Sequence, residues 1–242
     1  MQNQEFPLRE EGARSRVFRN FPCEDYKLKS DIRASALEKL GVLPSSIDVD
    51  LFASAKNKQE PLFCSKGNSC WSYHWGRLTK HPADYLWANP PFSKLARAVT
   101  KVALEKARVV MITPDWGTNG LNGYWRRVLD RLTVRRFVLP EVALYEKFGS
   151  PEKLLPKPHW NTLISVLDGS ISQVDDSELD PSIVKLIKKK EKGWGREELK
   201  SRVQGKFSQE VMEIEFREKD TTPPSQGNGI QEQGTEICEH DH

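Results

Sequence analysis

Asn89-Pro90-Pro91-Phe92 is the part of the sequence whose residue types and spacing point most directly to chemistry. The tetrapeptide follows an apolar segment, DYLWA, so we expect it at the end of a strand, where α/β sheets bind ligands. Two successive prolines make this turn rigid, which fixes the Asn89 side-chain oxygen and the Pro90 carbonyl as acceptors. An adenine N6 amine has two hydrogens to donate to them, and Phe92 would stack on a flipped base. The alternative is a purely structural turn, with Phe92 in the core and Asn89 capping a helix.

The tetrapeptide resembles the motif of amino-methyltransferases, which is usually Asn or Asp followed by Pro-Pro and an aromatic residue. A second resemblance lies upstream, in VDLFAS at 49–54 together with Asn57. This segment is similar to the D-x-x-A-x-x-x-N stretch of phage-type Dam-like DNA N6-adenine methyltransferases, and Trp75 lies where that family often has a tryptophan. DLFAS also resembles the start of the Asp-x-Phe-x-Gly cofactor motif. Pro114-Asp115-Trp116 and Tyr124-Trp125 resemble related segments of retroelement polyproteins, and the matches together span about 46–167.

The resemblance implies a Rossmann-like domain that uses S-adenosylmethionine and methylates adenine N6 in DNA. It implies a cofactor site and a target-amine site, formed by Asp50, Phe52, Ala53 and Asn57 and by Asn89, Pro90, Pro91 and Phe92, respectively. An RNA amine or a protein glutamine is an alternative substrate, because the motif binds a planar amine rather than a polymer.

A second hypothesis is a catalytically inactive, retroelement-derived nucleic-acid-binding protein with the same fold. Ala53-Ser54-Ala55 stands where glycines would let a backbone approach the cofactor. The segment between Asp50 and Asn89 is also too short for the about two further strands of a full methyltransferase. A partner subunit that completes the cofactor site is a further alternative.

Hydrophobic periodicity predicts the elements that position these residues. Apolar residues recur four apart from Leu28 to Leu40, which predicts a helix over 27–40 ended by Gly41. Strands are expected at 47–52, 84–88, 108–113, 135–139 and 161–167, helices at 93–107 and 122–132, and an irregular aromatic-rich loop at 56–82. The strand, helix and strand at 84–113 form a βαβ unit with parallel strands. We therefore predict an α/β fold: a Rossmann-like methyltransferase sheet, reduced in size, with helices on both faces and flexible termini.

Composition indicates how the chain is organised around this sheet. Hydrophobic residues make up 37% of the 242 and charged residues 29%, which is polar for a single core. We expect an N-terminal arm at 1–26, the methyltransferase-like domain at 27–170, a linker at 171–181, a basic helix at 182–204 and a largely disordered tail at 205–242. The sequence shows no signal peptide and no run of about 18 apolar residues, and its four cysteines are scattered. We therefore expect an intracellular protein that does not bind a membrane. The resemblance, in turn, implies DNA, or alternatively RNA, as its partner.

Several other residues allow a functional and a structural interpretation. Cys64, Cys70 and His74 are zinc-ligand types, with Cys23 or His81 as a fourth, but their spacing is weak and we expect buried thiols without a metal. Trp71, Tyr73, Trp75 and Trp87 either contact bases or fill the core. Asp115 either shapes a pocket or caps a turn. The net charge is only +3, but basic residues gather near the C-terminal end and either bind phosphates or form a solvated helix face: Lys185, Lys188, Lys189, Lys190, Lys192, Arg196, Lys200 and Arg202.

Overall fold

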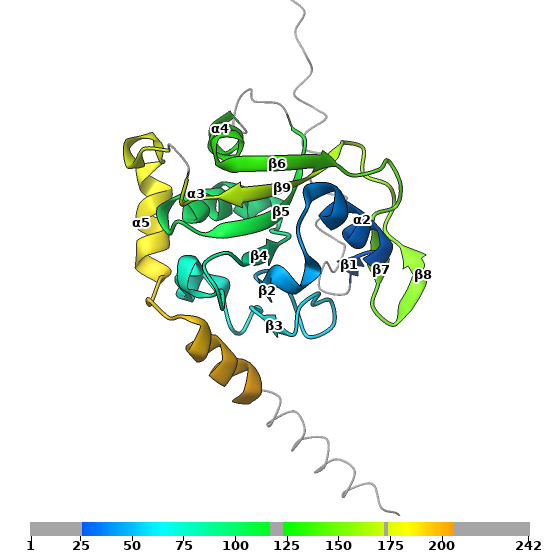
Figure 1. The fold of residues 1–242 in the computed structure, drawn as a ribbon, viewed down its shortest axis with the longest axis horizontal. Helices are drawn as coiled ribbons and strands as arrows, with labels where there is room; N and C mark the ends of the chain where they lie inside the picture. Colours follow the sequence, from blue (N-terminus) through cyan, green and yellow to red (C-terminus); the bar gives the residue numbers. More distant parts are fainter. Residues whose placement is uncertain (1–25, 117–122, 172–173, 206–242) are drawn as a thin grey trace, which may run out of the picture. The chain divides into compact units, whose positions relative to one another are not determined.

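The computed structural model describes residues 26–116, 123–171 and 174–205 (Figure 1). Its strands are β1 (Tyr26–Leu28), β2 (Ile47–Asp50), β3 (Leu62–Phe63), β4 (Tyr85–Ala88), β5 (Arg108–Pro114), β6 (Thr133–Val138), β7 (Tyr145–Lys147), β8 (Ser150–Leu154) and β9 (Thr162–Asp168). Its named α-helices are α2 (Ser30–Leu40), α3 (Leu95–Leu104), α4 (Gly123–Leu132) and α5 (Pro181–Lys190). Almost all of the arm predicted at 1–26 and of the tail predicted at 205–242 lies outside the described residues. None of the helices in the described part of the chain has the length and apolar content of a transmembrane span.

Six strands form one mixed sheet in the order β3-β2-β4-β5-β9-β6. β3, β2, β4 and β5 are parallel, and β9 runs antiparallel between β5 and β6. The predicted βαβ unit is confirmed, because α3 connects the adjacent parallel strands β4 and β5. From β2 the chain moves outward to β3 and then returns past β2 to β4, so the strand order reverses between β2 and β4. Open α/β sheets bind ligands at the carboxyl ends of the strands beside such a reversal.

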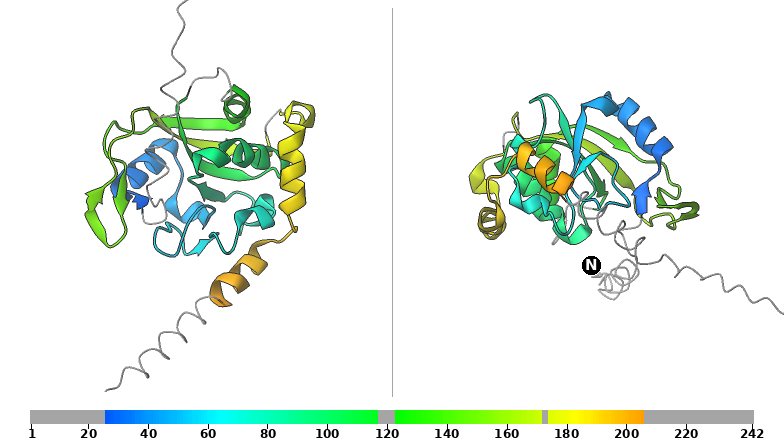
Figure 2. Two further views of the ribbon diagram at one scale, coloured as in Figure 1. Left: turned by 180° about the vertical axis from the view of Figure 1, so that it is seen from behind. Right: turned by 90° about the horizontal axis from the view of Figure 1, so that it is seen from below.

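Alternate residues of the central strands pack into two cores, one on each face of the sheet. On β4, Tyr85 and Trp87 join the core under α2, whereas Leu86 and Ala88 join the core under α3 and α4. All four residues are buried, which explains why this strand appears in the sequence as a continuous apolar run. Helices therefore cover both faces, as predicted; Figure 2 shows α2 on one side of the sheet and α3 on the other.

A second, three-stranded antiparallel sheet was not predicted. It has the order β1-β7-β8, and both β7 and β8 lie in the connection between β6 and β9. The helix predicted over 27–40 is wrong at its start, because Tyr26–Leu28 pairs with β7 as a strand and α2 begins at Ser30. Tertiary pairing here outweighs the four-residue period. The predicted helix end is confirmed, since Gly41 takes a left-handed φ of 61°.

The core does not end near residue 170. Leu179 and Leu199 are buried in the core that includes α3, and Ile187 of α5 is also buried. The single basic helix predicted over 182–204 is wrong, because α5 and a helix at 196–205 are separated by residues 191–195. Gly193 has a φ of 69° in this break, and the next residue, Trp194, packs edge-on against Tyr73 at 5.7 Å between ring centroids. The break thus anchors the basic segment on the domain.

Candidate functional site

Asn89 directly follows β4, at the carboxyl edge of the parallel strands, and Asp50 is the last residue of the neighbouring strand β2. Asn89 is half-buried, and its Oδ1 accepts a long hydrogen bond of 3.5 Å from the Tyr145 hydroxyl. Pro90 is buried, and within the described residues its carbonyl accepts no hydrogen bond. Phe92 is 41% exposed and Pro91, not Asn89, caps the turn that leads to α3. The interpretation of Phe92 as core and Asn89 as a helix cap is therefore wrong.

Three aromatic rings contact one another, and we call them the aromatic cluster: Phe92, Trp116 and Trp160. Phe92 lies edge-on to Trp116 at 5.0 Å and to Trp160 at 5.4 Å, and the two tryptophans are 5.8 Å apart. Trp116 follows β5, and Trp160 precedes β9, whose antiparallel direction brings its start to the carboxyl edge. The sequence did not predict a role for Trp160, and Trp116 was noted only because its segment resembles a known one. The signal that was present is that each tryptophan adjoins a predicted strand end.

A cavity of about 690 Å³ opens at the same edge of the sheet. Asp115 and Trp160 line it, so the pocket-shaping interpretation of Asp115 is confirmed and the aromatic cluster borders the cavity. Leu144 also lines it, next to the Tyr145 that contacts Asn89. The remaining lining residues are Leu139, Pro140, Glu141, Lys157, Pro158, His159, Asn161 and Thr162.

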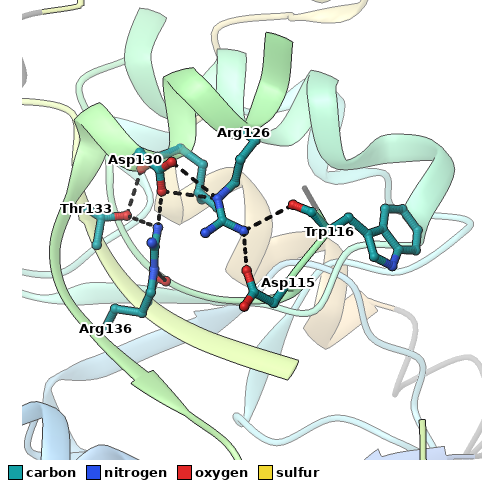
Figure 3. Close-up of polar contacts among 8 residues, drawn as sticks. Asp115, Trp116, Arg126, Asp130, Thr133 and Arg136 are labelled. Carbon is teal, nitrogen blue, oxygen red and sulfur yellow. Dashed lines mark hydrogen bonds and ion pairs between the residues drawn. The ribbon is translucent and has the colours of Figure 1, made fainter. Parts of the chain in front are cut away.

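Arg126 of α4 holds the end of β5 in place (Figure 3). Its Nη1 donates to Asp115 Oδ1 at 2.7 Å and to the Trp116 carbonyl at 3.4 Å. Its Nε donates to Asp130 at 3.1 Å, and Arg136 of β6 donates to the same carboxylate at 2.6 Å. The network thus ties the backbone that carries Trp116 to α4 and β6.

The residues predicted to bind the cofactor build a closed turn after β2. Asp50 is 4% exposed, and its carboxylate accepts from the backbone N–H groups of Phe52 at 3.3 Å and Gln59 at 3.1 Å. Burial raises the pKa of Asp50 to about 6. Asn57 Oδ1 accepts from Ser54 N at 2.6 Å, and Asn57 Nδ2 donates to the Tyr26 carbonyl at 3.1 Å. Asp50 therefore caps this turn.

Ala53 and Phe52, also predicted to bind the cofactor, make structural contacts. The Ala53 N–H donates to the Cys64 carbonyl at 3.1 Å, across to the segment after β3. Phe52 packs edge-on against Trp71 at 5.7 Å and Trp75 at 6.1 Å, and these two indoles stack on each other. The four aromatics considered as base contacts are all buried, at 0–9% exposure, so they are core residues: Trp71, Tyr73, Trp75 and Trp87.

Arg97, on the first turn of α3, is a buried cation in this region. Its guanidinium lies over the Trp71 ring at 3.8 Å, and the residue is 7% exposed. Nε and Nη2 are buried without a hydrogen-bond partner. The side chains of Asp50 and Asn57 are already hydrogen-bonded within the capped turn, so they provide few free groups for S-adenosylmethionine. The two unpaired N–H groups of Arg97, by contrast, match a carboxylate such as the one at the amino-acid end of that cofactor.

Of the described residues considered as zinc ligands, Cys64 and Cys70 are buried, His74 is half-buried and His81 is exposed. Cys64 and Cys70 are free buried thiols, and burial raises the pKa of Cys70 to about 12. Over the described ranges, no three or more His, Cys, Asp and Glu side chains are grouped so that they could hold a metal ion. Cys23 lies outside those ranges.

The basic C-terminal segment has two parts. Lys188, Lys189 and Lys190 are exposed on α5, where they are available to phosphates. Arg196, by contrast, donates to the Leu78 carbonyl at 3.0 Å, and Arg202 lies over the Trp194 ring at 4.0 Å. The second part therefore contributes to packing.

No protein-family profile matches the sequence, and no curated protein matches it.

Proposed function

We propose that this chain is an S-adenosylmethionine-dependent methyltransferase that acts on the N6 amine of adenine in DNA, on a reduced Rossmann-like sheet. One observation carries the proposal: the Asn89 and Pro90 acceptors follow β4 at the carboxyl edge, and the same turn continues into Phe92, a partly exposed member of the aromatic cluster. The reversal of strand order between β2 and β4 supports it, since ligands of α/β sheets bind there.

The residues at this edge suit a planar base that carries an amino group. Asn89 Oδ1 and the Pro90 carbonyl accept the two N6 hydrogens, which increases electron density on the nitrogen. The Tyr145 hydroxyl donates a long hydrogen bond of 3.5 Å to Oδ1, which identifies this atom as an acceptor. The base stacks on the aromatic cluster once it has left the duplex, since the amine of a paired base is not accessible. S-adenosylmethionine, when bound, supplies an electrophilic methyl group on a sulfonium sulfur.

The direct test is methyl transfer to DNA by the full chain. Purified protein is incubated with S-adenosylmethionine and adenine-containing duplex or single strand, and N6-methyladenine is measured by mass spectrometry. Asn89→Asp keeps an acceptor at the same place and should retain activity, whereas Asn89→Ala should lose at least about 100-fold, because an acceptor present in the transition state is removed. Full activity of Asn89→Ala would show that the motif is not the catalytic site. RNA and glutamine peptides, tested in parallel, report on the alternative substrates.

A second candidate function is base binding without methyl transfer. The specific observation that favours it is the closed turn after β2, in which Asp50 and Asn57 are hydrogen-bonded to the backbone. Such a domain would bind adenine-containing single strands through the aromatic cluster and would show no calorimetric signal with S-adenosylmethionine. Micromolar binding of the cofactor by the chain alone excludes this candidate. Binding only after a further subunit is added points to a shared cofactor site.

A further inference from the structure

Arg97 presents an unusual charge arrangement, because a buried cation is normally paired. It is 7% exposed, and Nε and Nη2 have no hydrogen-bond partner. No carboxylate of the described residues forms an ion pair with it. The contrast is Lys101, one turn later on the same helix, which is fully buried and paired with Glu105. A buried charge without a counter-charge is strongly destabilising, so the Arg97 site is built for an anion that is not part of the described chain.

The guanidinium is positioned by the aromatic residues around it. Trp71 lies under its plane at 3.8 Å, which fixes the orientation of the group. Phe52, two residues beyond the end of β2, packs edge-on against the same indole. Arg97 itself follows the Asn89–Phe92 turn by one helical turn. The unpaired N–H groups therefore lie where the end of β2 and the start of α3 meet, beside the reversal of strand order.

The geometry of the two unpaired nitrogens selects the class of anion. Nε–H and one Nη2–H form one straight edge of a guanidinium, and this edge donates two parallel hydrogen bonds to the two oxygens of a planar carboxylate. We propose that Arg97 binds the α-carboxylate of the methionine part of S-adenosylmethionine. This inference rests on the proposed function and adds to it the residue that anchors the amino-acid end of the cofactor.

The proposed contact predicts the affinities of wild type and of two variants. Wild type should bind S-adenosylmethionine about 10- to 100-fold more tightly than decarboxylated S-adenosylmethionine, since a hydrogen-bonded pair with a charged group contributes that much. Arg97→Gln should lose the same factor for S-adenosylmethionine and bind both ligands equally. Arg97→Lys should lie between, because the ammonium keeps the charge but cannot form the two parallel bonds.

The experiment is calorimetric titration of the full chain with S-adenosylmethionine, S-adenosylhomocysteine and decarboxylated S-adenosylmethionine. Lys94→Gln is the matched control, since Lys94 is an exposed cation at the start of the same helix and should bind like wild type. The comparison of the ligands on wild type needs no variant, so misfolding of Arg97→Gln leaves the test intact. Equal affinity of wild type for S-adenosylmethionine and its decarboxylated form overturns the inference and leaves the proposed function standing. If folded wild type binds neither ligand, both are overturned.

Discussion

Replacing Phe92 by leucine tests whether the aromatic cluster stacks on a base. The change removes the ring but keeps an apolar side chain, and it breaks the two edge-to-face contacts at 5.0 and 5.4 Å. Each such contact contributes about 0.5–1.5 kcal/mol when buried. Because Phe92 is 41% exposed, we expect the free energy of unfolding to fall by only about 1 kcal/mol. Loss of base stacking should cost about 1–3 kcal/mol of binding, which weakens affinity by roughly 5- to 150-fold.

Fluorescence anisotropy with a labelled single-stranded oligonucleotide measures this effect. One oligonucleotide carries a single adenine, and the second has an abasic site at the same position, so the difference between them isolates the contribution of the base. Phe148→Leu is the matched control, because Phe148 is also an exposed phenylalanine, at 52%, between β7 and β8. We expect Phe92→Leu to remove most of the preference for adenine over the abasic site and Phe148→Leu to preserve it.

Two results would refute the stacking role. The first is equal weakening of both oligonucleotides by Phe92→Leu, which indicates a general loss of binding rather than lost stacking. The second is an unchanged preference for adenine in a folded Phe92→Leu variant.

Three further predictions concern stability and positioning. Burial raises the pKa of Asp50 to about 6 and that of Glu60 to about 7, so the folded chain binds more protons than the unfolded chain between about pH 4 and 7. The stability that these protonated carboxyl groups contribute at low pH is lost as the pH rises through these values. In urea unfolding, the free energy of unfolding of wild type should rise by about 2–4 kcal/mol from pH 7.5 to pH 5, relative to the double variant Asp50→Asn/Glu60→Gln. An equal pH dependence of the two proteins would contradict the raised pKa values. Arg126→Gln should lower the free energy of unfolding by about 1–3 kcal/mol and reduce the preference for adenine, because it removes the hydrogen bonds to Asp115 and the Trp116 carbonyl. Arg127→Gln, at the exposed neighbouring position, should change neither quantity. Equal effects of the two variants would exclude a specific role of Arg126 in positioning Trp116. Lys101→Met should cost about 3–5 kcal/mol in urea unfolding because Glu105 is left buried and unpaired, and Glu105→Gln in the same chain should restore most of it; a lack of recovery contradicts the charge argument.

The central strands were predictable because strands buried on both faces have short, continuous apolar sequences. β4, β5 and β9 are buried on both faces, and their predicted limits differ from the observed ones by a residue or so. β7 and β8 have no such signal, since β8 is the mostly exposed SPEKL segment and is held by backbone pairing with β7. β1 likewise depends on a partner more than a hundred residues away in the sequence. Pairing between short exposed segments leaves little trace in hydrophobic periodicity.

Some residues of the candidate site were predictable from local sequence, whereas others depend on tertiary structure. The position of Asn89-Pro90-Pro91-Phe92 follows from local chemistry, because a buried strand followed by two prolines must turn at the sheet edge. Trp160 and Arg97 could not be placed from the sequence, because their roles depend on an antiparallel strand insertion and on the burial of a cation. Unpaired buried groups are visible only once the partners of each polar atom are known.

Under the proposed function, the closed turn after β2 limits which residues can contact S-adenosylmethionine at this edge. Several hydrogen bonds hold it, among them two to the Asp50 carboxylate and those of the Asn57 side chain with Ser54 and the Tyr26 carbonyl. Each contributes about 0.5–1.5 kcal/mol, so a ligand that opened the turn would lose several kcal/mol of its binding energy. A ligand that leaves the turn closed would instead use the Arg97 guanidinium that we propose as its anchor. Asp50→Ala is then expected to lower the unfolding free energy by about 1–3 kcal/mol with little change in calorimetric affinity for S-adenosylmethionine at temperatures where the variant is folded. A selective loss of affinity with unchanged stability would instead show that Asp50 contacts the cofactor and that the turn opens on binding.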